Sequence, residues 1–111
     1  MKRQAPRARV LVVDYLTILP DTGAACFGVP LTTTQLDFER GVAARLKTAT
    51  EQAAANTGAT LIDAASASTT HHSCSAVPWV EKYVTAPLHA AYHSTPAGMI
   101  GVADLITGNL D

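Results

Sequence analysis

The chain has 111 residues, of which 48% are hydrophobic and 15% charged, with a formal net charge of −1. That length suits one compact domain, and the composition excludes a disordered chain, which would combine low hydrophobicity with high charge. Lys and Arg do not cluster with aromatic residues, so the sequence gives no electrostatic footprint for nucleic acid or for an anionic membrane. We therefore expect neither as a partner.

The opening segment, "MKRQAPRARVLVVDYLTILP", places basic residues ahead of an apolar run, as a secretory signal would. Asp14 and Tyr15 interrupt that run after four residues, and no apolar stretch of seven or more follows the charges. We expect no signal peptide in this chain. A transmembrane segment is not expected either, because no window approaches 18 consecutive apolar residues.

Two short apolar runs flank a long helical pattern. Val10 to Val13 is a β-branched run typical of a buried strand, and "ATLIDA" at 59–64 predicts a second strand. The intervening helix has its N-cap among Thr32 to Thr34 and its end at Asn56-Thr57-Gly58. Apolar residues at spacings of three and four define its buried face: Phe38, Val42, Leu46, Ala49 and Ala53. This order indicates a parallel βαβ unit, which lacks enough helices to cover both faces of a sheet.

The second half of the chain contains a long loop and a final helix. Ser66 to Pro87 is rich in Ser, Thr and Ala and is predicted as loop, with a short helical piece around Val80 to Val84. Long loops at the carboxyl ends of strands are where α/β folds place their sites. Thr95 and Pro96 then predict a helix start, and Gly108 predicts its end.

His93 stands directly before that last helix, in a position suited to a general base; a surface or capping histidine is the alternative. His89 and His93 also have the i, i+4 spacing of paired metal ligands. The residues available for such a zinc site are His71, His72, Cys74, His89 and His93. Prolines bracket the His89–His93 pair, and no Cys-x-x-Cys or His-Glu-x-x-His spacing is present. We therefore expect no metal and no other cofactor.

Cys26 and Cys74 each lie in a predicted loop after a predicted strand. Adjacent parallel strands would bring those loops together, which favours a disulfide and with it an oxidising compartment. Two free buried thiols are the alternative. No serine lies in Gly-x-Ser-x-Gly or in Gly-Asp-Ser-Leu, where a sharp turn after a strand exposes the hydroxyl, so none is predicted to be a nucleophile.

Three blocks in chain order resemble the C-terminal half of the SGNH hydrolases, the GDSL group of secreted lipases and esterases: "RVLVVDYLTILP", "GATLIDAASASTTHHSCSAVPWV" and "YHSTPAGM". The resemblance covers nearly the whole chain. It implies an α/β fold of the flavodoxin-like, three-layer α/β/α type with a parallel sheet. Residues 1–111 would then be the C-terminal βαβα segment of a single SGNH hydrolase domain.

The same resemblance implies roles for individual residues. His93, in "HSTPAG", is implied to be the general base, and the "HHSCSAVPWV" block implies a disulfide-forming Cys74. That block also places His71, Pro78 and Trp79 near the site. The family often has an Asp three residues before its His; here that residue is Ala90, whose backbone carbonyl could orient the imidazole instead, unless another acid such as Asp63 approaches it.

The Gly-Asp-Ser block of the family and its oxyanion-hole Gly and Asn blocks are absent from this sequence. The resemblance thus implies that His93 activates a serine supplied by an N-terminal segment, with a small-molecule ester or lipid as substrate. The isolated chain is expected to be inactive, with the edge of its first strand unpaired. The alternatives are an inactive truncated fragment, a pseudoenzyme or binding module, and a small His/Cys metal protein.

Overall fold

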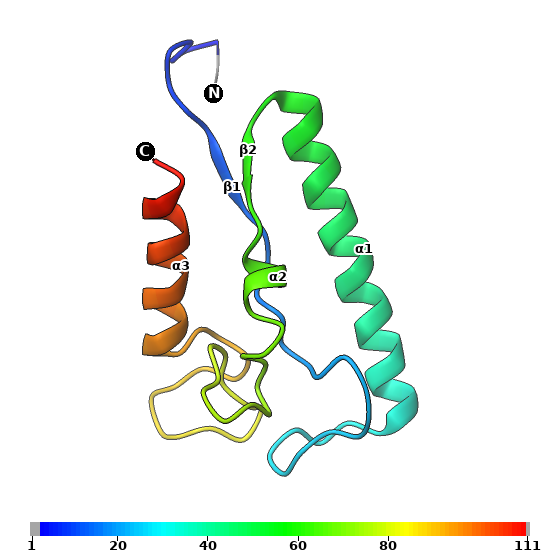
Figure 1. The fold of residues 1–111 in the computed structure, drawn as a ribbon. Helices are drawn as coiled ribbons and strands as arrows, with labels where there is room; N and C mark the ends of the chain where they lie inside the picture. The colour runs from blue at the N-terminus through cyan, green and yellow to red at the C-terminus, as the bar shows by residue number, and fades with distance from the viewer. Residues whose placement is uncertain (1–2, 111) are drawn as a thin grey trace.

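The computed structural model describes residues 3–110 and has an α/β fold, as predicted (Figure 1). Its elements in chain order are β1 (Leu11–Val13), α1 (Thr33–Thr57), β2 (Thr60–Ile62), α2 (Ala64–Ala67) and α3 (Pro96–Gly108). The two strands pair in parallel, with Val12 opposite Leu61. Because α1 connects them, the predicted βαβ unit is present.

The helix α1 begins and ends where the sequence predicts. Thr32 is its N-cap: the Gln35 backbone N–H donates to the Thr32 hydroxyl (3.2 Å), and the Thr32 N–H donates to the Gln35 side chain (2.9 Å). This reciprocal pair satisfies two backbone donors that would otherwise lack partners. Gly58 ends the helix in the left-handed conformation, with φ at 64°, which costs a glycine little.

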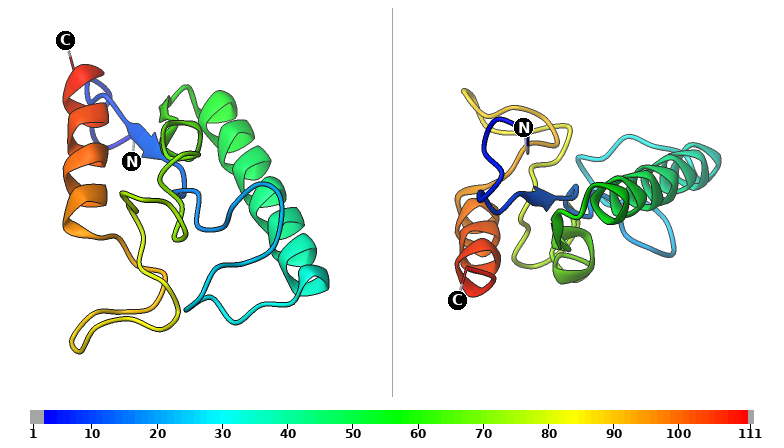
Figure 2. Two further views of the ribbon diagram at one scale, coloured as in Figure 1. Left: turned by 60° about the horizontal axis from the view of Figure 1, so that its bottom comes forward. Right: turned by 90° about the horizontal axis from the view of Figure 1, so that it is seen from above.

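Within residues 3–110 the buried apolar residues come from several segments: Val29, Leu36, Ala54, Ile62, Ala64 and Val80. Leu36 of α1 and Ile62 of β2 are almost fully buried, at 0% and 1% exposure. In each view the two strands lie between α1 and α3 (Figures 1 and 2). The prediction that Phe38, Val42 and Leu46 lie on a buried face of α1 is wrong, because they are 66%, 37% and 46% exposed.

Within residues 3–110 each strand has one neighbour, so β1 keeps an unpaired edge, as expected. Val13 at the end of β1 is 39% exposed. No helix in this part of the chain combines the length and the apolar character needed to cross a bilayer.

The prediction of a helical piece around Val80 to Val84 is wrong. Val80 instead forms an isolated antiparallel bridge with Ser94. The local sequence does not reveal this pairing, because the partner lies fourteen positions away and the bridge forms only when the loop folds back. The short helix α2 was not predicted; Asp63 caps it by accepting the Ser66 N–H at 3.0 Å.

Candidate active site

The loops that carry the predicted site residues gather at one end of the molecule. β1 and β2 run in the same direction, and the segments after both strands leave at this end (Figure 1). The amino end of α3 points to the same region (Figure 1), and His93 lies three residues before it in the chain. Parallel α/β sheets hold their functional groups at the carboxyl ends of their strands.

The backbone of His93 is held by the segment from Pro78 to Glu81. The Glu81 N–H donates to the His93 carbonyl at 2.8 Å, and the Thr95 N–H donates to the Trp79 carbonyl at 2.9 Å. The Thr95 hydroxyl also donates to the Pro78 carbonyl at 2.8 Å and accepts the Gly98 N–H at 3.1 Å. Thr95 therefore caps α3, as predicted, and joins the helix to this segment.

Trp79 lies between His71 and α3. The rings of His71 and Trp79 stack, with centroids 4.5 Å apart and an angle of 7° between their planes. The His71 Nδ1 lies 2.8 Å from the Val77 carbonyl oxygen, so this nitrogen carries a proton and donates. On the α3 side, a Cβ added at Gly98 would overlap the Trp79 carbonyl, and one added at Gly101 would overlap the indole. The two glycines thus let α3 approach Trp79 closely.

The His93 side chain is exposed, and no hydrogen bond or ion pair to its ring occurs within residues 3–110. The Ala90 carbonyl accepts the backbone N–H of His93 at 3.2 Å. The Asp63 carboxylate lies 2.7 Å from the Lys47 Nζ and accepts from Ser66. The orienting role of Ala90 therefore stays a prediction, and Asp63 is engaged elsewhere.

The five residues considered as metal ligands do not converge. In the described part of the chain, no group of three or more His, Cys, Asp or Glu side chains could hold a single metal ion. The His89 Nδ1 lies 2.6 Å from the Glu81 carboxylate. The His72 Nδ1 accepts the Cys74 backbone N–H at 3.2 Å, and Cys74 is itself in a disulfide.

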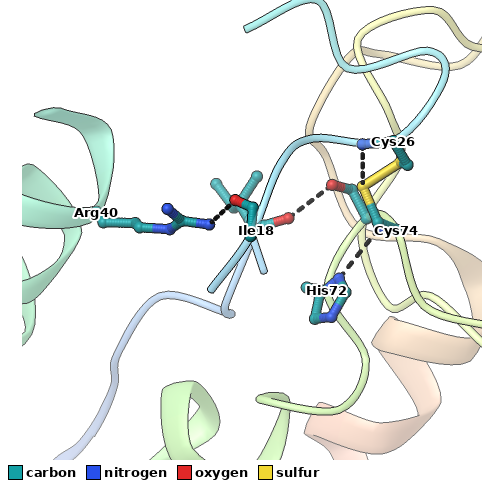
Figure 3. The surroundings of a disulfide bond; sticks show 7 residues. Ile18, Cys26, Arg40, His72 and Cys74 are labelled. Atoms are coloured by element: carbon teal, nitrogen blue, oxygen red, sulfur yellow. Dashed lines mark hydrogen bonds between the residues drawn. A yellow bond between two sulfur atoms is a disulfide. The ribbon is translucent and has the colours of Figure 1, made fainter. Parts of the chain in front are cut away.

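The predicted disulfide between Cys26 and Cys74 is present, with the two Cα atoms 5.7 Å apart (Figure 3). Beside it, the Ile18 carbonyl accepts both the Ser73 N–H (2.9 Å) and the Ser73 hydroxyl (2.7 Å). These contacts join the loop after β1 to the loop that leads toward His93. The disulfide therefore fixes the two sides of the site relative to each other.

A charged cluster, not anticipated from the sequence, joins the ends of both strands to α1. The Lys47 Nζ lies 2.7 Å from Asp63, 2.9 Å from Glu51 and 3.4 Å from Asp14. Asp14 is buried and accepts the Ala65 N–H at 2.9 Å. The hydrogen bond from Lys47 holds the pKa of Asp63 well below its usual range, and the same bond raises the pKa of Lys47. Asp14 directly follows β1 and Asp63 directly follows β2, but the second strand was predicted to run through Asp63 to residue 64, so local spacing gave no signal for the cluster.

An apolar groove of about 630 Å³ lies between the segment after β1 and the first half of α1. Its walls include Leu16, Ile18 and Leu46, and Tyr92, the residue before His93, also lines it. Burial raises the pKa of the Tyr92 phenol. The sequence could not show this groove, because its walls come from segments that only tertiary folding brings together.

The chain is similar to two Streptomyces enzymes. It is 35% identical over 85 residues to Lipase 2 of Streptomyces coelicolor, an alignment that covers 73% of this chain and 29% of the lipase. It superposes on the crystal structure of phospholipase A1 from Streptomyces albidoflavus NA297 with a TM-score of 0.84 and 28% identity. That match covers 96% of this chain and 45% of the phospholipase, so the chain spans less than half of either relative.

No protein-family model matches the sequence. The fold, the disulfide and the lipase relatives nevertheless agree with the motifs around Cys74 and His93. The chain thus resembles the C-terminal part of the SGNH-type lipases.

Proposed function

We propose that this chain supplies the general base of a secreted carboxylic ester hydrolase of the lipase or esterase type. The observation that supports the proposal is the position of His93 just before α3, whose amino end points to the loops that follow both strands, with the His93 carbonyl bound by the Glu81 N–H. The nucleophilic serine and the oxyanion-hole donors would come from an N-terminal segment that completes a three-layer, flavodoxin-like domain. The lipase relatives support an ester substrate.

In the proposed reaction, the His93 imidazole accepts the proton of the serine hydroxyl as the serine oxygen attacks the ester carbonyl. The imidazolium then returns this proton to the leaving alcohol, and the same ring activates water to release the acid. General acid–base assistance of this kind contributes about 10²–10⁴-fold to the rate. The Ala90 carbonyl, which accepts one backbone N–H, retains a second lone pair with which it would orient the ring.

Two further features support the proposal. The Cys26–Cys74 disulfide suits the oxidising environment that a secreted enzyme meets. The groove beside Tyr92 is apolar, as the acyl or alkyl part of an ester requires. Lipid esters are the substrate class we favour, since one relative is a phospholipase A1.

The test is an assay with p-nitrophenyl esters on the chain alone and on the chain joined to a serine-bearing N-terminal segment of an SGNH hydrolase. We expect hydrolysis only from the joined protein, and a loss of at least about 10²-fold in kcat for His93→Ala. His89→Ala is the matched control, because its ring is bound to Glu81, and it should keep most of the activity. Hydrolysis that is unaffected by His93→Ala would disprove the assignment, and failure to restore activity would favour a pseudoenzyme or binding module.

A further inference from the structure

Two loops at the His93 end of the molecule carry apolar side chains that are almost wholly exposed. Phe27, in the loop after β1, is 94% exposed, and Leu88, in the loop before His93, is 105% exposed. Tyr83 and Val84 beside them are 58% and 63% exposed. We call Phe27, Tyr83, Val84 and Leu88 the loop-tip patch. Phe27 and Leu88 are more exposed than any apolar side chain of α1, where exposure reaches 66% at most.

The loop-tip patch is held in place rather than formed by loose chain ends. The Val84 N–H donates to the Gly28 carbonyl at 3.0 Å, which joins the two loops one residue from Phe27. The disulfide anchors the first loop at Cys26. Leu88 adopts φ of 70°, a left-handed conformation that is unfavourable for a leucine. Non-glycine residues in such conformations concentrate where a side chain must be presented to a ligand or partner.

The four side chains of the loop-tip patch are uncharged, and the charged groups lie at its border: the Lys82 side chain lies close to Gly28, and the Glu81 carboxylate accepts from the Thr85 hydroxyl. No Asp, Glu, Lys or Arg occurs in residues 22–36 or in residues 83–88. A surface that enters lipid must not carry charged groups, because removing them from water costs several kcal/mol each. Separate convex tips need no shape-matched pockets to be buried in lipid, whereas a protein partner would need one for each tip. The chemistry therefore favours a lipid surface over a protein.

We propose that the loop-tip patch inserts into the surface of a zwitterionic phospholipid layer and holds the His93 end of the molecule against it. The inference rests on the proposed function, since it names an aggregated lipid as the physical form of the ester substrate. It agrees with the lack of a basic footprint in the sequence, because the attraction is apolar rather than electrostatic. Anionic lipid should therefore add little to binding.

The first test measures flotation of the 111-residue chain with phosphatidylcholine vesicles. Because burying one large apolar side chain is worth about a tenfold change in partitioning, Phe27→Ser and Leu88→Ser should each weaken binding by about tenfold. The matched controls are Ile100→Ser on α3 and Leu110→Ser beyond its end, which are 64% and 53% exposed and lie outside the loop-tip patch. They should change binding by less than about twofold. Equal losses in both sets, or no loss at the loops, would overturn the proposal.

The second test places a reporter in the loop-tip patch. Leu88→Trp should be quenched by brominated phosphatidylcholine, whereas the single native tryptophan, Trp79, should not be, since it is held against α3. An unquenched Leu88→Trp in bound protein would refute insertion. Neither measurement needs the serine, so vesicle binding without hydrolysis would contradict only the proposed activity, and hydrolysis without loop-dependent binding would contradict only this inference.

Discussion

Asp63 shows how a single side chain ties the stability of this fold to pH. The hydrogen bond from Lys47 lowers the pKa of the Asp63 carboxyl in the folded protein. In the unfolded chain this carboxyl has a pKa of about 4, so near that pH the unfolded state binds more protons than the folded state does. The stabilisation is present above that pH and is lost as pH falls through the folded pKa. Because the carboxylate is 43% exposed, screening leaves the effect at about 1 kcal/mol or less.

We therefore predict that the free energy of unfolding begins to decrease as pH falls through about 4, the pKa of Asp63 in the unfolded chain, and keeps decreasing below about pH 3 toward the lowered pKa of the folded state. Asp63→Asn should lower stability at pH 7 and flatten this pH dependence, which urea titrations at several pH values would measure. Asp104→Asn is the control, since Asp104 forms no ion pair in the described part of the chain. An unchanged slope in Asp63→Asn would refute the role of the Lys47 bond.

The disulfide between Cys26 and Cys74 should contribute strongly to the stability of the folded chain. Cys26 and Cys74 are separated by 48 positions, and closing a ring of that size lowers the entropy of the unfolded chain by an amount worth about 4 kcal/mol, as an upper figure. The double variant Cys26→Ala/Cys74→Ala should lose a large part of this in denaturant titrations, and reduction should have the same effect on the wild-type chain but none on the variant. Equal stability of the oxidised and reduced chains would contradict the prediction.

The packing of helix α3 against Trp79 is the contact that positions His93. Adding a methyl group at Gly98 or Gly101 would force the backbone or the indole to move, because each new Cβ would overlap Trp79. We predict that Gly98→Ala and Gly101→Ala each lower the free energy of unfolding by about 1–3 kcal/mol. Gly108→Ala is the matched control: its Cβ would meet nothing within 4 Å, so it should be neutral or slightly stabilising.

Denaturant titration of the three alanine variants would check this prediction. Nuclear magnetic resonance of the histidine side chains would add a test of position. The His93 signals should move in Gly98→Ala, because Thr95 is bonded both to the Gly98 N–H and to the Trp79 carbonyl. Gly98→Ala as stable as Gly108→Ala would show that α3 does not depend on this close approach.

The elements that the sequence predicted correctly are those with local signals. Thr32 and Gly58 mark the ends of α1 by chemistry that lies within four residues, and Pro96 marks the start of α3 in the same way. The segment at Val80 was mispredicted because its structure depends on Ser94. Likewise, the Lys47 cluster and the groove beside Tyr92 combine segments far apart in the chain, so neither local spacing nor composition could reveal them.

Considered as a whole, the molecule carries two apolar surfaces of different kinds. The loop-tip patch is formed by side chains of two loops, whereas Phe38, Val42 and Leu46 lie in a row along α1, where Val42 and Leu46 also line the groove. A continuous apolar stripe along one helix is suited to burial against protein. In the proposed enzyme, the N-terminal segment would extend the sheet and cover part of this stripe.

In the isolated chain these apolar side chains of α1 stay exposed to water unless a second copy of the chain covers them. We therefore predict that the chain self-associates at micromolar concentrations. Size-exclusion chromatography with light scattering should show a mass that rises with protein concentration. Phe38→Ser/Leu46→Ser should shift the chain toward monomer, because both side chains lie on the exposed side of α1, whereas Phe27→Ser in the loop-tip patch should not. A wild-type chain that stays monomeric at tens of micromolar would show that the uncovered face of α1 does not need a partner, and the case for a complementing N-terminal segment would then rest on the chemistry of His93 alone.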